Sequence, residues 1–399
     1  MKDEEDRAVE NWKGEVKMST STEIEKQIFT AIESGDAVLL RTALASKPDV
    51  NILDENAMTP LQHAAYKGNK DMVQMLLDYG ADPNLCKHQH NYTALHFAGL
   101  SGNSDVCLAL LVAGAFPEVT NAVNRTASQM AAFVGHHKCV AIINNYIPKS
   151  EVDYYSRLQG AQTEPYLPPF LSESFHKLII QVNVHPVKIA LNINSFIGLS
   201  QHLAKIKKVL ELMYDKEMQR GAGNNEVMAF KLYYLAFIVG EVMTIQNKHQ
   251  SPDATLQTFC KKVLKPATDG ALEILDGLLR ECIKHFPFRE CTLFRQMVTT
   301  LTGKDTPTAL SVINSAINGQ RGFVDNVPIC YTCGEEKPSK KCSQCKVAQY
   351  CDKTCQKLHW CWHKKACPQL AQEPLKCNND TQIDPQELSS EIQNLLVTN

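Results

Sequence analysis

The sequence predicts a mainly α-helical protein with three parts: a helical repeat solenoid, an all-helical middle domain and a small cysteine-rich module near the C-terminus. Three observations support this prediction. A motif recurs every 33 or 34 residues in the N-terminal third, and the middle of the chain keeps apolar residues at helical spacing. Eight of the fifteen cysteines lie between Cys330 and Cys367. The 399 residues suffice for two or three domains.

Three of the repeat units begin with a threonine followed by a short apolar helix start, and the first unit lacks it. Thr59 is followed by Thr93 after 34 residues and by Thr126 after another 33. A threonine just before a helix caps its free N–H groups. Glycines such as Gly68 end the helices, because glycine adopts the left-handed conformation without strain. The pattern predicts about four helix-pair units over residues 23–146.

These units resemble ankyrin repeats, as in Thr-Pro-Leu-Gln-His-Ala-Ala at residues 59–65. The resemblance implies a stack that has no active site of its own and binds proteins through its hairpin tips. It makes His88, His90, Tyr92 and Arg125 candidate residues of the partner surface. The alternative use of the two histidines as metal ligands lacks a second ligand pair nearby.

The middle segment is interpreted as a linker followed by a helical domain. Residues 147–170 hold four prolines among polar residues, which is typical of a linker or an extended cap. Residues 171–320 suffice for a packed helical domain. The apolar stretch 227–245 contains Lys231 and Glu241, and its uncharged run is shorter than the roughly 20 residues that span a bilayer. We therefore expect a buried helix there and no direct membrane insertion.

Both ends of the chain are predicted to be disordered. Residues 1–22 begin with an acidic run and lack the apolar stretch of a secretory signal. Residues 368–399 are polar and acidic. Without a secretory signal we expect a cytosolic chain, and in the reducing cytosol clustered cysteines bind metal more often than they form disulfides.

The cysteine-rich module offers eight candidate metal ligands in four close pairs. Their spacings are Cys-x2-Cys, Cys-x2-Cys, Cys-x3-Cys and His-x3-Cys. Thiolates and a neutral imidazole suit tetrahedral Zn²⁺, and four pairs fit two ions. About forty residues bury too little apolar surface to fold alone, so we expect both ions to be structural. The candidate ligands are Cys330, Cys333, Cys342, Cys345, Cys351, Cys355, His363 and Cys367.

The module, residues 328–367, resembles a MYND finger in the order of its ligands and of the residues around them. MYND fingers bind short proline-containing peptides, so the resemblance implies a peptide groove lined by Ser343, Gln356 and Trp360. A tryptophan ring offers a flat apolar wall to proline rings. Packing inside the finger is the alternative role of Trp360.

MYND fingers also interleave their ligands, which implies that the first and third pairs bind one ion and the second and fourth pairs bind the other. Replacement of His363 by His359 is the alternative at the second site, and Cys361 is a surplus thiol. Both ligand sets are complete, without the open position of a catalytic zinc. The first set is Cys330, Cys333, Cys351 and Cys355, and the second is Cys342, Cys345, His363 and Cys367.

Charge and motifs argue against nucleic-acid binding and against catalysis. The net charge is −2, and the eight lysines of the module, against three acidic residues, mostly balance the thiolates. Gly303-Lys304 lacks the upstream glycine of a phosphate-binding loop. Neither a Ser-His-Asp pattern nor a dinucleotide-binding motif is present, so we do not expect an enzyme.

The combination of ankyrin repeats, a helical segment and a MYND finger resembles a family of non-enzymatic adaptors. That family is linked to the trafficking of membrane cyclases and signalling proteins to the cilium. The resemblance therefore implies membrane cyclases or other ciliary cargo as partners, and a cytoplasmic and ciliary location. The alternative is a nuclear corepressor-type adaptor, although no basic run longer than two lysines is present as an import signal.

Overall fold

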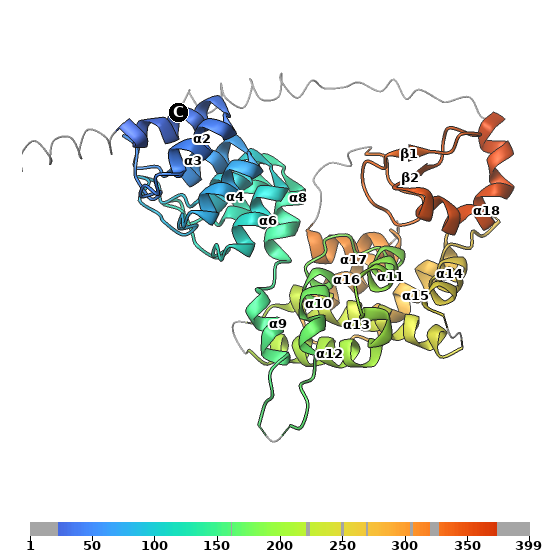
Figure 1. The fold of residues 1–399 in the computed structure, drawn as a ribbon. Coiled ribbons are helices and arrows are strands. Elements are labelled where there is room, and N and C mark those ends of the chain that lie inside the picture. The colour runs from blue at the N-terminus through green and yellow to red at the C-terminus, as the bar shows by residue number, and fades with distance from the viewer. Residues whose placement is uncertain are drawn as a thin grey trace, which may run out of the picture.

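The computed structural model shows a helical repeat stack, a helical domain and a small C-terminal module (Figure 1). The predicted mainly α-helical class is confirmed. The two predicted disordered segments lie outside the described residues, apart from the first five residues of the C-terminal one. The structure describes residues 23–160, 162–220, 224–248, 251–268, 270–303, 306–319 and 327–372.

The stack consists of four helix pairs. The first helix of three of the pairs begins with a capping box, in which a threonine and the residue three positions later bond to each other's backbone N–H groups. Thr59 pairs with Gln62 in this way. The pairs are residues 23–34 with α2 (Ala37–Leu44), α3 (Pro60–Lys67) with α4 (Lys70–Asp78), α5 (Ala94–Ser101) with α6 (Ser104–Val112), and α7 (Ala127–Val134) with α8 (His137–Asn144).

Asparagine side chains join successive units of the stack at their hairpins. Asn51 Oδ1 accepts from the Asp82 N–H at 2.8 Å, and Asn84 Oδ1 accepts from the Phe116 N–H at the same distance. Asn84 Nδ2 also donates to the Gly114 carbonyl at 2.9 Å. The same bond therefore recurs one unit later, which fixes the spacing between units.

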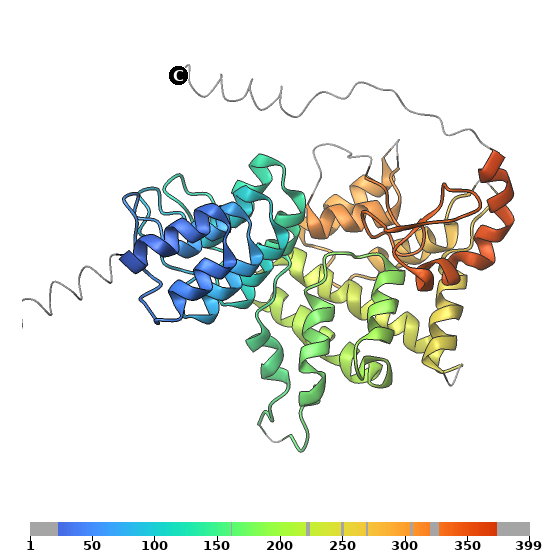
Figure 2. The ribbon, with the colours of Figure 1, turned by 45° about the horizontal axis from the view of Figure 1, so that its top comes forward.

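The helical domain is built around α12 and α13, which pack side by side (Figure 2). By length and composition, α13 would suffice to cross a membrane, but 67% of that stretch is buried inside the domain. This burial agrees with the expected core helix. The domain comprises α10 (Ser172–Ile179), α11 (Pro186–Ser195), η2 (Leu199–Gln201), α12 (Leu203–Gln219), α13 (Glu226–Gln246), α14 (Pro252–Val263), α15 (Glu273–Lys284), α16 (Thr292–Thr302) and α17 (Ala309–Asn318).

Residues 147–170, interpreted from the sequence as a linker or cap, fold onto the helical domain. They contain α9 (Lys149–Tyr155) and lead into η1 (Pro169–Leu171). Val152 and Leu167 are fully buried in the core of that domain. The segment is therefore part of the domain, because its apolar residues are covered and its prolines serve as helix starts and turns.

The C-terminal module contains β1 (Lys340–Lys341) and β2 (Gln349–Tyr350), paired antiparallel, and α18 (Lys353–Gln372). Residues 368–372, which the sequence assigns to the acidic tail, are helical, because α18 continues through Pro368. Proline costs the helix one hydrogen bond, but Leu370 packs against the core in the last turns.

The stack has a hydrophobic core of its own, whereas the helical domain and the C-terminal module share one. The stack and the module lie at opposite ends of the helical domain (Figures 1 and 2). At the stack end, α8 packs against α17. There Lys231 of α13 is fully buried, and its Nζ donates to the Asn145 carbonyl just after α8, at 3.4 Å.

Candidate functional site

The eight candidate ligands of the C-terminal module lie in two groups, and each group brings its ligand atoms within 4.8 Å of one another. Both groups are almost wholly buried. The grouping agrees with the interleaved arrangement that the resemblance implies. The first group is Cys330, Cys333, Cys351 and Cys355, and the second is Cys342, Cys345, His363 and Cys367.

The distances within each group fit a tetrahedral zinc ion. With Zn–S of about 2.3 Å and Zn–N of about 2.0 Å, two sulfurs should lie about 3.8 Å apart and a sulfur and a nitrogen about 3.6 Å apart. In the first group, Cys333 Sγ lies 3.6 Å from Cys351 Sγ and 3.8 Å from Cys355 Sγ.

The second group shows the same agreement. Cys342 Sγ lies 3.8 Å from Cys367 Sγ, and Cys345 Sγ lies 3.6 Å from His363 Nε2. These separations exceed the roughly 2 Å of a disulfide bond. The module thus has the donor set and the spacing for two structural Zn²⁺ ions, which would replace the large apolar core that so short a segment lacks.

Two similar turns orient the two Cys-x2-Cys pairs, each toward the centre of its ligand group. In the first turn the Gly334 N–H donates to the Cys330 carbonyl at 3.0 Å, and in the second the Lys346 N–H donates to the Cys342 carbonyl at 2.9 Å. Gly334 and Lys346 both have positive φ, at 66° and 59°. Each turn thereby folds back on itself and directs two sulfurs to one point. Gly334 also packs closely on His185 of the helical domain.

Helix α18 supplies ligands to both groups, which ties the two sites to one rigid element. Asp352 starts the helix by accepting the Cys355 N–H at 2.8 Å. Cys355 belongs to the first group, while His363 and Cys367, two and three turns further along, belong to the second. Loss of either site is therefore expected to disturb the other through α18.

The structure favours His363 over His359 at the second site. His363 Nε2 lies in the ligand group, whereas His359 Nδ1 lies 3.0 Å from the Tyr350 hydroxyl. The His359 ring stacks on that of His363 at 5.9 Å between centroids. Cys361 belongs to neither group, and its Sγ faces the Leu358 carbonyl at 3.9 Å.

Two of the three candidate peptide-groove residues meet on the outer face of α18. Gln356 and Trp360 line a shallow cavity of about 310 Å³ together with Lys353 and Lys357. Trp360 is 43% exposed, so part of its side chain is available to a ligand. Ser343 is exposed on the turn between Cys342 and Cys345 and does not line this cavity.

The hairpin residues of the stack form an aromatic group. His88 lies 5.5 Å from the Tyr92 ring and 5.4 Å from the His90 ring, measured between centroids. Partial burial, and then the neighbouring His90, lower the pKa of His88. The His90 carbonyl accepts the Ala122 N–H of the next hairpin, which also carries the exposed Arg125. The two predicted tips therefore lie side by side.

A row of apolar residues on the first helices of the units, exposed at Tyr66 and Phe133 and half-buried at Leu100, extends this surface and is not predicted from the sequence. Tyr66, Leu100 and Phe133 occupy the same position in successive units, and Phe133 is 79% exposed. The Tyr66 ring lies 6.0 Å from Phe97, which in turn contacts Tyr92 at 5.4 Å. The sequence carries a signal for this row, because an apolar residue recurs at the same position of successive units, 33 or 34 residues apart. That position does not need an apolar residue for the helix to bury its inner face.

Comparisons with known proteins agree with both modules. A family model described as ankyrin repeats, in three copies, matches residues 28–121, and the model of the MYND finger matches residues 330–367. Dauer abnormal formation protein 25 of Caenorhabditis elegans is 31% identical over 389 residues, which cover 94% of this chain and 99% of that protein.

Other relatives match over smaller shares. The E3 ubiquitin-protein ligase Ufd4 of Drosophila melanogaster is 27% identical over 49% of this chain and 7% of its own length. The putative E3 ubiquitin-protein ligase XBAT31 of Arabidopsis thaliana is 30% identical over 34% of this chain and 30% of its own length.

Proposed function

Because the chain belongs to the family of Dauer abnormal formation protein 25 and joins ankyrin repeats to a MYND finger, we propose that it is a non-enzymatic adaptor that holds two different protein partners. The observation that carries the proposal is the mounting of both interaction modules on one helical domain. The finger shares its core with that domain, and the stack is joined to it by buried hydrogen bonds. Such a mounting sets a defined separation between the two partners.

In this proposal the zinc ions have a structural role. The first group of four cysteines and the second group of three cysteines and His363 each bind one ion, with every ligand supplied by this chain. Each bound ion contributes folding free energy of about 10 kcal/mol or more, as in other small zinc modules. The ions thereby order α18 and the exposed face that carries Gln356 and Trp360.

The finger would bind a proline-containing peptide on that face. Trp360 offers an exposed indole ring, and the Gln356 amide lies beside it to bond the peptide backbone. A ligand in the extended polyproline conformation loses little entropy on binding. Ser343, on the turn between Cys342 and Cys345, would contact the peptide where it leaves the cavity.

The stack would bind the second partner through its aromatic hairpin group and the adjoining apolar row. His88, His90, Tyr92 and Arg125 form the tip, and Phe133 lies along the first helices. Aromatic rings and arginine dominate many protein interfaces, because they bury a large area at small entropic cost. This composition suits a protein partner.

We further propose that this second partner is a membrane cyclase or other ciliary cargo, and that the chain acts in the cytoplasm and the cilium. This step depends on the resemblance of the whole domain arrangement to the ciliary adaptor family. A nuclear corepressor-type adaptor would use the same two modules with other partners.

Affinity purification of the tagged full chain from ciliated cells tests the cargo. We expect membrane cyclases among the recovered proteins, reduced at least tenfold by Phe133→Ser and unchanged by Val38→Ser, a matched change at an exposed valine of α2. Recovery of no membrane cyclase or other ciliary membrane protein would refute the cargo. Fluorescence of the tagged chain confined to the nucleus would favour the corepressor alternative.

A further inference from the structure

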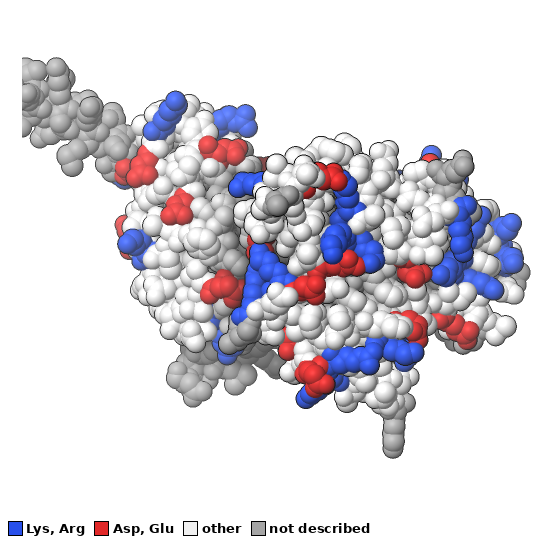
Figure 3. All heavy atoms as spheres, turned by 90° about the horizontal axis from the view of Figure 1, so that it is seen from below, with Lys and Arg blue, Asp and Glu red and all other residues white. Residues whose placement is uncertain are grey.

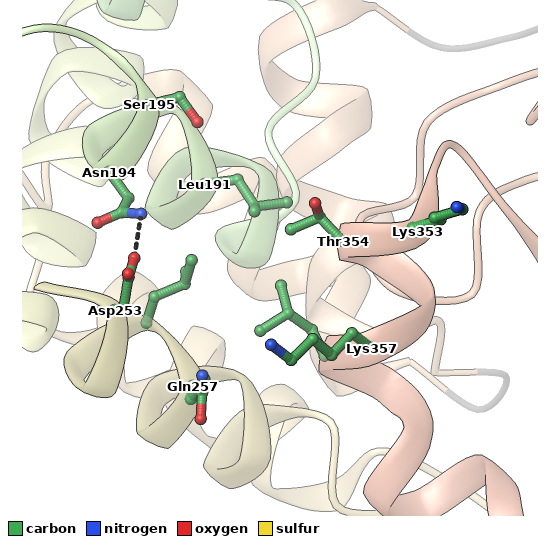
Figure 4. Close-up of a pocket in the computed structure, with 10 residues that line it drawn as sticks. Leu191, Asn194, Ser195, Asp253, Gln257, Lys353, Thr354 and Lys357 are labelled. Carbon is green, nitrogen blue, oxygen red and sulfur yellow. Dashed lines mark hydrogen bonds between the residues drawn. The ribbon is translucent and has the colours of Figure 1, made fainter.

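The finger and the helical domain together form a cavity that neither forms alone. It has a volume of about 300 Å³ and lies between α11, α14 and α18 (Figure 4). Leucine side chains from all three helices line it: Leu191, Leu256 and Leu358. Leu256 and Leu358 are buried, so the floor is apolar, whereas the rim is polar and open to solvent.

The rim carries groups suited to a peptide. Asn194 Nδ2 donates to Asp253 Oδ1 at 3.1 Å, which keeps that carboxylate on the helical-domain side. Among the described residues the exposed Gln257 amide makes no hydrogen bond. Figure 4 shows Lys357 reaching from α18 into the space between the three helices, whereas Lys353 points away from them. The cavity thus has the Asp253 carboxylate, bonded to Asn194, and the free Gln257 amide on the helical-domain wall, and the Lys357 ammonium on the wall of the finger.

This cavity continues into the candidate peptide groove of the finger. Lys353 and Lys357 line both the cavity between the three helices and the cavity of Gln356 and Trp360. The eight residues from Lys353 to Trp360 on a helix span about 10 Å. An extended peptide covers that distance in about three residues. A ligand at Trp360 that is a few residues longer therefore reaches the cavity.

The charge of the shared segment indicates what the ligand carries. Within the part of the chain that the structure describes, neither Lys353 nor Lys357 pairs with a carboxylate. By contrast, Lys262 of nearby α14 pairs with Glu241 at 3.3 Å. Basic side chains gather at the end of the molecule that holds the finger (Figure 3). The unpaired Lys357 ammonium, which lines both cavities, favours a carboxylate in the occupant of the groove.

We propose that the peptide partner of the finger lies across this composite groove and is acidic as well as proline-containing. Its proline segment contacts Gln356 and Trp360, and within about three residues of it an Asp or Glu meets Lys357. An apolar side chain beyond it enters the cavity between α11, α14 and α18. The proposal rests on the proposed peptide binding of the finger and adds a specificity determinant from the helical domain.

Selection of a displayed library of random 12-residue peptides on the full zinc-loaded chain tests this. Among peptides whose binding is lost with Trp360→Ala, we expect enrichment of Asp or Glu within about three residues of a proline, followed by Leu, Ile or Phe. Fluorescence polarisation with the most enriched peptide should show about tenfold weaker binding to Lys357→Glu. Exchange of its acidic residue for lysine should restore binding to that variant. The matched change Lys340→Glu, in β1, should leave binding unchanged.

The variant Gln257→Arg tests the contribution of the helical domain, because it fills the cavity from α14. It should weaken the full peptide about tenfold and leave unchanged a peptide truncated after its acidic residue. The composite groove would be overturned if the Trp360-dependent peptides showed no preference for acidic residues and bound Lys357→Glu and Gln257→Arg as well as the wild type. Peptide binding by the finger would still stand in that case. Recovery of no Trp360-dependent peptide would refute peptide binding itself, and the composite groove with it.

Discussion

Asn145 Nδ2 donates a hydrogen bond to Asn318 Oδ1 over 3.0 Å and so joins the end of the ankyrin stack to the end of α17. The same amide donates to the Ile317 carbonyl, and Asn318 Nδ2 donates onward to the Val182 carbonyl at 2.9 Å. Asn145 is buried, so these bonds form where water cannot replace them. The junction is therefore a specific contact between two domains.

Replacement of Asn145 by alanine is expected to loosen this junction. It leaves buried acceptors on α17 without a donor, which costs about 1–3 kcal/mol. Hydrogen exchange should speed up in both α8 and α17. The matched change Asn84→Ala, which removes a bond between units of the stack, should leave α17 protected. Unchanged exchange at α17 in Asn145→Ala would mean that the junction does not depend on this side chain.

Lys231 should make stability depend on pH. Burial lowers the pKa of its ammonium group to about 7 in the folded chain, so between about pH 7 and 10 the unfolded chain binds more protons. The wild-type free energy of unfolding should therefore rise with pH across this window, by up to about 1.4 kcal/mol per pH unit from this residue.

The variant Lys231→Met isolates that contribution, because methionine fits a buried site and does not titrate. Urea denaturation at pH 7 and pH 9 should show a larger advantage of Lys231→Met over the wild type at pH 7 than at pH 9. A difference between the two proteins that is the same at both pH values would show that Lys231 titrates normally.

The ligand assignment predicts the zinc content of paired variants. Cys345→Ser and His363→Ala remove ligands of the second site, so native mass spectrometry should find fewer than two zinc ions per chain. Cys361→Ser and His359→Ala alter neighbours outside the groups and should keep two. A loss of zinc in His359→Ala with retention in His363→Ala would reverse the histidine assignment.

Removal of zinc should affect the helical domain as well as the finger. Asn183 Nδ2 donates to the Cys333 carbonyl at 3.1 Å, and Lys188 pairs with Glu335 at 3.2 Å, so unfolding of the finger uncovers part of α11. With a zinc chelator, hydrogen exchange should speed up in α11 and α14 and stay unchanged in α3 to α6 of the stack. Exchange confined to the finger would show that the finger and the helical domain are independent.

The zinc groups are the part of the site that sequence reasoning described best. Two cysteines with two or three residues between them are held by a local turn, such as the one that ends at Gly334 with positive φ. The spacing alone therefore constrains where the sulfurs point. The capping threonines of the repeat are equally local, since Thr59 acts only within four residues.

The docking of the finger on the helical domain could not be predicted from the sequence. It depends on pairs such as Asn183 with Cys333, which are 150 residues apart and carry no periodic signal. Apolar spacing in α11 and α14 shows that each helix has a buried face, but not which neighbour covers it. For the same reason the sequence of residues 147–170 indicates only a linker or an extended cap, although Val152 and Leu167 are fully buried in the helical domain.

In the proposed function, one chain presents two separate partner surfaces on a common support. Quantitative affinity purification of the wild type, Phe133→Ser and Trp360→Ala from the same cells tests it most directly. We expect each variant to lose its own set of partners at least tenfold and to keep the other set, with both sets recovered by the wild type. Loss of the same partners by both variants would show that the chain does not hold its partners on two separate surfaces. Retention of all partners by both variants would show that neither surface binds them.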